Sequence, residues 1–255
     1  MAPLLDVRDV TVRFGGIVAL NGVGFDVRRG DICGLIGPNG AGKTTLFNCL
    51  SRIYAWNNGD IRFEGRSLAD VPRHEVAGLG IGRTFQNLAL FPAMSVEGNV
   101  MAGSHCRARS TWMANMLGLP HVTAERREQR ARAAELLDLM GLSALRHTTV
   151  RDLPFGLAKR VELARALASG PKLLLLDEPA AGLNHDEVGE LARLIRRVRD
   201  TMELTVLLVE HHMGLVMSVS DRVVALNFGR RLAEGTPDAV RNDPAVVEAY
   251  LGAAA

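Results

Sequence analysis

The segment that most constrains the fold is a glycine-rich run of eight residues, Gly37-Pro-Asn-Gly-Ala-Gly-Lys-Thr44. It fits the spacing G-x-x-x-x-G-K-[ST] and lies between a predicted buried strand at Ile32 to Ile36 and a predicted helix at Thr44 to Ile53. That order of strand, loop and helix is typical of an α/β unit that binds phosphate groups. An ordinary glycine turn needs neither the strand before it nor the helix after it.

The chemistry of this phosphate loop follows from its residue types. The glycines let backbone N–H groups point inward, and the start of the helix adds its positive end. Lys43 supplies a compact cation for the β- and γ-phosphates of a nucleotide, and the hydroxyl of Thr44 is placed to hold Mg²⁺. The predicted nucleotide-contacting residues of the loop are Gly37, Asn39, Gly40, Ala41, Gly42, Lys43, Thr44 and Thr45.

A pair of acidic residues ends the apolar run Leu173 to Leu176, which reads as a second buried strand. Ligands of open α/β sheets bind at the carboxyl ends of the strands, so Asp177 and Glu178 are expected beside the phosphate loop. Asp177 is predicted to hold the Mg²⁺ shell, and Glu178 to orient or deprotonate the attacking water. The alternative is an acidic helix start after a core strand.

Two further polar residues are ambiguous when taken alone. Thr84-Phe85-Gln86-Asn87 offers the amide of Gln86, which has the reach for both metal and water. Val209-Glu210-His211-His212 offers the imidazole of His211 after another strand. A lone glutamine or histidine is more often a solvated or structural side chain than a catalytic group.

The wider pattern predicts an α/β fold with a P-loop NTPase core and a mainly parallel sheet, an N-terminal antiparallel β-subdomain and an inserted α-helical subdomain. We expect one domain over residues 1–255, with the core and β-subdomain in 1–95 and 171–255 and the insert in 96–170. Predicted strands are Leu5 to Val7, Val10 to Phe14, Val23 to Val27, Ile32 to Ile36, Ile61 to Phe63, Leu173 to Leu176, Thr205 to Val209, Val223 to Leu226 and Arg231 to Ala233; further predicted helices are Glu125 to Met140 and Asp186 to Asp200.

Composition excludes several classes of protein. The 255 residues carry 30 Lys and Arg against 28 Asp and Glu, and a net charge of +2 does not favour nucleic acid as a partner. Three cysteines without CxxC spacing fit buried reduced thiols better than a disulfide frame or a zinc site. Apolar runs are far shorter than the roughly 20 residues of a membrane helix, and no secretory signal is visible. We expect a cytosolic chain that does not span a bilayer.

Taken in order, these residues resemble the ATP-binding subunits of ABC transporters, over essentially the whole chain. The resemblance implies ATP and Mg²⁺ as cofactors and Mg-dependent ATP hydrolysis as the activity. It also implies that Phe14 stacks on adenine, that Gln86 is a metal-contacting and catalytic residue facing a membrane partner, and that His211 is the switch histidine on the γ-phosphate.

Several stretches are similar to one group within that family, the larger ATPase subunit of branched-chain amino acid importers. They are Phe14 to Leu20, Gly82 to Asn87, Asp177 to Asn184, Glu210 to Met213 and Glu248 to Gly252. The resemblance implies a second ATPase subunit, two multi-span permeases docked near Gln86 to Gly103, and a periplasmic or surface binding protein that acts through them. The chain would sit on the cytoplasmic face of the cell membrane, without a nucleic-acid partner.

One element departs from the family pattern. ABC ATPases carry a signature, commonly Leu-Ser-Gly-Gly-Gln, which closes over the ATP of the partner subunit; here the matching run is Leu153-Pro-Phe-Gly-Leu157. The predicted contacts in trans are Leu153, Phe155 and Gly156. Pro154 has no hydroxyl or N–H, and Leu157 lacks an amide. We therefore expect slow or partner-dependent hydrolysis at that second site.

Other readings stay open on the sequence alone. The cassette has counterparts in amide or urea import, in lipid export and among soluble ABC ATPases that do not transport. A non-hydrolysing regulatory cassette is suggested only by Pro154 and Leu157.

Overall fold

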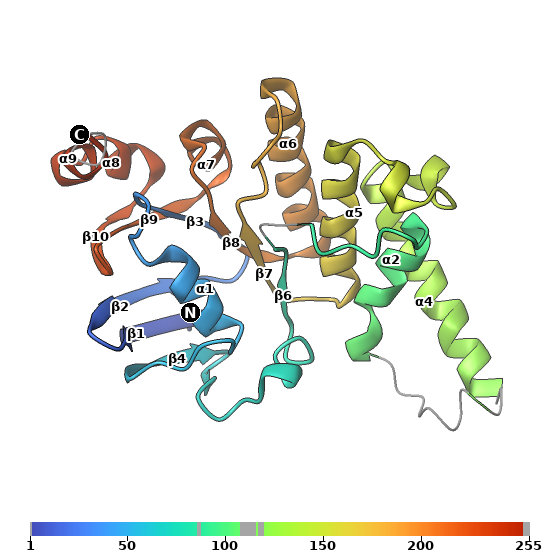
Figure 1. The fold of residues 1–255 in the computed structure, drawn as a ribbon, viewed down its shortest axis with the longest axis horizontal. Helices are drawn as coiled ribbons and strands as arrows, with labels where there is room; N and C mark the ends of the chain where they lie inside the picture. The colour runs from blue at the N-terminus through green and yellow to red at the C-terminus, as the bar shows by residue number, and fades with distance from the viewer. Residues whose placement is uncertain (1, 86–87, 108–115, 117–119, 252–255) are drawn as a thin grey trace.

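The computed structural model contains two β-sheets flanked by helices (Figure 1). It describes the whole chain except residues 1, 86–87, 108–115, 117–119 and 252–255. The larger sheet has six strands in the order β10-β9-β3-β8-β7-β6, and the smaller has four in the order β2-β1-β4-β5.

The central sheet is parallel from β6 to β9, and only β10 runs antiparallel to its neighbour. Its strands are β3 (Ile32–Ile36), β6 (Ile81–Arg83), β7 (Leu173–Asp177), β8 (Thr205–Val209), β9 (Arg222–Asn227) and β10 (Arg230–Gly235). The parallel order confirms the predicted fold class. It also places the carboxyl ends of β3, β7 and β8 at one edge.

Burial of both faces explains why these strands are continuously apolar. Alternate side chains of β7 enter different cores: Leu174 and Leu176 join one cluster of buried residues, and Leu173 and Leu175 join the other. Every residue of β3, β7 and β8 is buried. Parallel sheets covered on both faces require this pattern.

The N-terminal sheet is antiparallel, as predicted, but its strands are longer. It contains β1 (Leu5–Phe14), β2 (Ile17–Val27), β4 (Asn58–Phe63) and β5 (Arg66–Ser67). The two short strands predicted before residue 15 were wrong as separate elements. They form one strand whose pairing is irregular around Asp9, which has φ of 47°.

The helices of the core are α1 (Lys43–Leu50), α6 (His185–Met202), α7 (Met213–Val219), α8 (Pro237–Arg241) and α9 (Pro244–Leu251). The prediction that α1 continues to Ile53 was wrong. The helix ends because Arg52 adopts φ of 55°, and its N–H turns back to Cys49 O at 2.9 Å. Cys33 and Cys49 are buried, and burial raises the pKa of their thiols to about 12 and about 11.

Between β6 and β7, the regular elements in the described residues are helices and 3₁₀ turns joined by loops. This part of the chain contains α2 (Val96–Gly103), α4 (Pro120–Leu139) and α5 (Phe155–Ala168), with 3₁₀ turns η2 (His105–Arg107), η3 (Ser143–Leu145) and η4 (Val150–Asp152); a further turn, η1 (Arg73–Glu75), precedes β6. These helices lie beyond the β6 edge of the sheet (Figure 1). Val100, Leu137 and Val161 share one hydrophobic cluster with Leu174 of the sheet, so the boundary of the insert at residues 96 and 170 stays a prediction.

The longest described helices are strongly polar. α4 has 20 residues and α6 has 18, and both carry several charged side chains. Within the described ranges, no helix combines the length and the apolar character needed to cross a membrane.

Candidate nucleotide site

The phosphate loop joins β3 to α1 and is held close to neighbouring backbone. Gly37 has φ of 150°, and a Cβ there would lie 2.3 Å from Leu226 O of β9. Gly42 has φ of 100°, and a Cβ there would lie 2.7 Å from Ala19 O of β2. Glycine is therefore required at both ends of the loop, since any side chain would push the loop away from these strands.

Lys43 is folded over this loop. Its side chain is 5% exposed, and Nζ donates hydrogen bonds to Gly37 O at 2.6 Å and Pro38 O at 3.0 Å. Burial lowers the pKa of Lys43, and the negative charge of Glu178 opposes that shift. The interaction with Glu178 places the ammonium group and the acidic pair in one electrostatic environment.

The other predicted loop contacts divide by exposure. Asn39, Gly40 and Thr44 are exposed, Thr45 is half-buried and Ala41 is buried. The exposed residues lie along the loop and in the first turn of α1, where backbone N–H groups have no partner within the helix. A phosphate group is accepted at such a position without rearrangement of the helix.

Thr44 and Asp177 provide the oxygen atoms that suit Mg²⁺. The Thr44 hydroxyl belongs to the first turn of α1, and Asp177, 4% exposed, is the last residue of β7. Mg²⁺ prefers oxygen ligands and is held in proteins by one or two carboxylates together with water and substrate phosphates. The donor chemistry of these two residues therefore fits Mg²⁺.

Glu178 and His211 meet where two neighbouring strands end. His211 Nε2 lies 2.7 Å from Glu178 Oε1, and their side chains are 44% and 16% exposed respectively. Glu178 has φ of 47°, and its N–H donates to Val209 O at 2.9 Å, so the chain turns sharply after β7. Such left-handed non-glycine residues cluster at functional sites, where the surrounding structure holds them.

A residue that sequence reasoning missed, Glu210, stabilises the backbone turns that follow β7 and β8. It is 3% exposed; Oε1 accepts the N–H of Ala180 at 2.6 Å, and Oε2 accepts those of His211 at 2.9 Å and His212 at 3.1 Å. Three N–H donors stabilise a buried carboxylate. A glutamate directly after a continuous apolar strand was the available signal.

Arg83 was also missed, although it lies in the family-like stretch Gly82 to Asn87. Its Nη2 donates to Asp177 Oδ2 at 2.7 Å in a buried ion pair. Gln86 lies outside the described residues, as does Asn87. The chain just before them is tied to the site, because the Thr84 hydroxyl accepts the N–H of Asp177 at 3.3 Å.

Phe14 presents an aromatic ring at the end of β1, packed against Tyr54. The side chain is 46% exposed, and its ring packs edge-to-face with Tyr54, with centroids 5.2 Å apart and planes at 72°. Tyr54 follows α1, and its N–H donates to Asn48 O at 3.1 Å. The exposed face of Phe14 is available for stacking on a planar ring.

The signature residues lie elsewhere. α5 begins at Phe155 with Pro154 as its N-cap, which provides no side-chain hydrogen bond, and Figure 1 shows α5 beyond the β6 edge, away from α1. Phe155 is 47% exposed, with the Lys159 ammonium 5.6 Å from the centre of its ring. Leu153 and Leu157 pack against the hydrophobic core, and Gly156 is half-buried.

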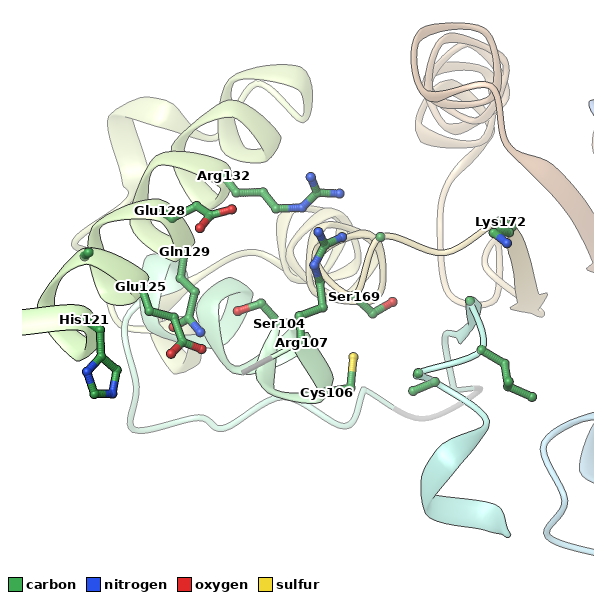
Figure 2. A pocket seen from close by; sticks show the side chains of 16 residues that line it. Ser104, Cys106, Arg107, His121, Glu125, Glu128, Gln129, Arg132, Ser169 and Lys172 are labelled. Atoms are coloured by element: carbon green, nitrogen blue, oxygen red, sulfur yellow. The ribbon is translucent and has the colours of Figure 1, made fainter. Parts of the chain in front are cut away.

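Two hollows lie between the central sheet and the helical region. One, of about 900 Å³, is lined by α4, η2 and the turn after α5, where Arg107 and Arg132 both approach Gly170 (Figure 2). Among the predicted site residues that the structure describes, none lines it. The other, of about 370 Å³, is named the docking hollow; Ser51, Arg83, Phe85, Phe91, Gly103 and Arg165 are among its lining residues.

Comparison with known proteins agrees with this geometry. A family described as ABC transporter matches residues 20–181, and one described as branched-chain amino acid ATP-binding cassette transporter matches residues 230–255. The chain is 42% identical to the high-affinity branched-chain amino acid transport ATP-binding protein BraF of Pseudomonas aeruginosa and 41% identical to LivG of Escherichia coli K12, with 99% of each chain covered in both pairs.

Solved structures give the same result. The crystal structure of the ADP conformation of an ATP-binding cassette of an ABC transporter superposes with a TM-score of 0.85 at 29% identity, covering 99% of this chain and 100% of the other. The phosphate loop with Lys43, together with Asp177, Glu178 and His211 at the carboxyl ends of β7 and β8, forms what is named the strand-end site. The fold and this site thus define a nucleotide-binding cassette that hydrolyses ATP. The chain belongs to the ABC transporter family, among the branched-chain amino acid transport ATP-binding proteins.

Proposed function

We propose that this chain is the ATP-hydrolysing subunit of an importer that takes up branched-chain amino acids across the cytoplasmic membrane. Two separate parts of the sequence support this cargo. Full-length relatives carry that activity in their names, and the match at residues 230–255 is to a family described by the same cargo. No feature of the described residues favours amide, urea or lipid transport instead.

The contact between Glu178 and His211 is the observation that carries the hydrolytic part of the proposal. At 2.7 Å the imidazole orients the carboxylate, and the charge of Glu178 acts on the Lys43 ammonium group, whose pKa it raises against the effect of burial. Glu178 positions and deprotonates the attacking water, and His211 contacts the γ-phosphate. Since both strand ends are rigid, these groups are arranged before the substrate arrives.

Binding of the nucleotide would use the rest of the site. Lys43 would exchange its loop carbonyls for the β- and γ-phosphates, and Phe14 would stack on adenine. Thr44, Asp177 and Gln86 would hold Mg²⁺. The ion, when bound, supplies charge neutralisation on the phosphate oxygens.

A second ATPase subunit would complete each site in a head-to-tail dimer. Leu153, Phe155 and Gly156 of this chain would then face the ATP of the partner, with backbone N–H groups of the first turn of α5 as donors to the phosphate. ATP drives closure because it binds the closed dimer more tightly than the open one.

The membrane partners would be two multi-span permeases seated on the docking hollow, which is lined in part by Phe85, Phe91 and Gly103. This places the chain on the cytoplasmic face of the membrane. A periplasmic or surface binding protein would deliver the cargo to the permeases and contact this chain only through them.

Reconstitution tests the proposal. The chain, its second ATPase subunit and its permeases are reconstituted in vesicles, with ATP on the side of the membrane that carries the ATPase subunits. Uptake of labelled leucine is then measured with the binding protein present on the other side. We expect uptake that valine and isoleucine inhibit and that Glu178→Gln abolishes. Inhibition by urea or acetamide alone, or movement of a lipid in the opposite direction, would overturn the assigned cargo.

A further inference from the structure

Arg83 is buried between two parts of the molecule that the proposed function leaves unconnected. It ends β6, the edge strand of the central sheet, and pairs in register with Leu175 of β7. Its side chain is 11% exposed, and that of its partner Asp177 is 5% exposed. An arginine so deeply buried is held by specific partners.

The guanidinium group joins the phosphate-loop helix to the metal carboxylate. Nη2 donates to Asp177 Oδ2 at 2.7 Å. Nη1 donates to the end of α1, at Phe47 O (3.3 Å), Asn48 Oδ1 (2.9 Å) and Ser51 Oγ (3.0 Å). The rigid planar fork of arginine allows both sets of bonds at once, which the single ammonium of lysine does not.

Two aromatic rings enclose the same group. The guanidinium carbon lies 5.7 Å from the centre of the Phe47 ring and 5.3 Å from that of Phe85, within the range of cation–π attraction. Phe85 is 40% exposed, and its N–H donates to the buried Glu162 of α5 at 3.2 Å.

Several residues of this arrangement also line the docking hollow. Arg83, Ser51 and Phe85 all line it, so an element seated there touches the residues that hold the guanidinium group. Asp177 does not line the hollow. Arg83 therefore bridges the hollow and the carboxylate.

We propose that Arg83 is a positioning residue: it fixes the carboxylate of Asp177 for Mg²⁺ and transmits the occupancy of the docking hollow to that carboxylate. The hydrogen bond from Arg83 to Asp177 Oδ2 fixes the χ2 torsion of Asp177 and so sets the orientation of its carboxylate. Residues that orient a metal ligand in this way change metal affinity without touching the metal. The inference rests on the proposed roles of Asp177 and of the hollow.

The first test measures ATP binding by calorimetry as Mg²⁺ is varied, with Glu178→Gln present in every variant to prevent turnover. For Arg83→Lys we expect ATP affinity in EDTA to stay within about twofold of the parent. The Mg²⁺ concentration that gives half of the maximal increase in ATP affinity should be roughly tenfold higher than for the parent. A structural defect alone would weaken binding in EDTA as well. Unchanged Mg²⁺ dependence in Arg83→Lys would overturn the inference.

Two further variants test whether this result is specific to Arg83. Asn48→Ala removes one hydrogen bond to Nη1 but leaves Arg83 in place. We expect a smaller increase in the Mg²⁺ concentration that it requires. If Arg83→Lys does not fold, an unchanged Mg²⁺ dependence of Asn48→Ala would overturn the inference. Arg222→Lys is the matched control, since the Arg222 guanidinium also joins separate elements, through Asp26 of β2 and Glu234 of β10, and Arg222 begins β9 at the end of the parallel sheet opposite this site. Its Mg²⁺ dependence should equal that of the parent.

The second test repeats the Mg²⁺ titration with the chain assembled on its permeases. The parent should show a different half-saturating Mg²⁺ concentration after assembly, and Arg83→Lys should lose that difference. An equal shift in both proteins, or none in the parent, would refute transmission through Arg83. If the parent binds ATP equally with Mg²⁺ and with EDTA, and Asp177→Asn matches it, the proposed metal site itself fails.

Discussion

The strand-end site and the start of α5 differ in how their polar groups are satisfied. At the strand ends Asp177, Glu178 and Glu210 each have a partner of opposite charge or an N–H donor, and most of these groups are buried. At the start of α5 the side chains of Leu153 and Leu157 face the core, and the Pro154 side chain provides no capping hydrogen bond, although its carbonyl accepts the N–H of Ala158 at 3.0 Å. Under the proposed function, the first region would carry out the chemistry within this chain, and the second would present backbone N–H groups to the nucleotide of a partner.

This difference teaches that the two nucleotide sites of a dimer need not be equivalent. A site built on this phosphate loop has its own lysine, acidic pair and histidine. A site that depended on this chain for its signature would receive N–H groups at the start of a helix, without the hydroxyl and amide that serine and glutamine would add. A partner with serine and glutamine in its signature would make the sites unequal.

The largest expected effect comes from removing the cation of the strand-end site. Lys43→Ala should lower ATP affinity by about 100-fold or more, since each hydrogen bond to a charged group contributes roughly 1.5–3 kcal/mol. Calorimetry of ATP binding measures it, with Lys172→Ala, which loses an exposed pair with Glu64, as control. ATP affinity within a few-fold of the parent would show that the phosphates bind elsewhere.

Glu178→Gln should separate binding from chemistry. ATP affinity is expected to stay near that of the parent, while turnover falls by about 10² to 10⁴, the usual contribution of a positioned base. Phosphate release under saturating ATP measures turnover. Glu203→Gln is the matched control, because Glu203 also has positive φ (52°) but follows α6 at the opposite end of β8. Parental turnover in Glu178→Gln would refute the catalytic assignment.

Restoring the signature tests the weaker region directly. Pro154→Ser with Leu157→Gln supplies the missing hydroxyl and amide, and ATP turnover of the purified chain should rise by up to about tenfold, equivalent to one extra charge-assisted hydrogen bond. Pro154→Ala removes the ring without adding a hydroxyl. If the double variant turns over no faster than Pro154→Ala, the signature is not the limiting element.

The smallest expected effect concerns Asn184, at the start of α6. Its Oδ1 accepts the N–H of Glu187 at 3.0 Å, and Glu187 Oε2 accepts the N–H of Asn184 at 2.9 Å, forming a capping box. Asn184→Ala should reduce stability by about 1 kcal/mol, and Asn184→Asp should retain it. Thermal unfolding measures both. An equal loss in the two variants would mean that the cap contributes nothing specific.

Much of the fold was predictable because its signals are local. The strand at Thr205–Val209 was predicted with its observed bounds, and the glycine-rich run marked the turn between β3 and α1. Predictions failed where backbone conformation decided the outcome. The left-handed φ of Arg52 ends α1, and the irregular pairing at Asp9 lets β1 continue. Arginine gives no sequence signal for a left-handed φ, and aspartate, although enriched there, still adopts it in only a small fraction of positions.

The sequence by itself determined the phosphate loop, the acidic pair and the buried strands, because each depends on spacing within a few residues. Only the tertiary structure decided which groups meet. Arg83 and Asp177 are 94 residues apart, and His211 and Glu178 are 33 apart. Fully buried parallel strands read alike in sequence, so their order, which sets these contacts, is decided by packing of the whole sheet.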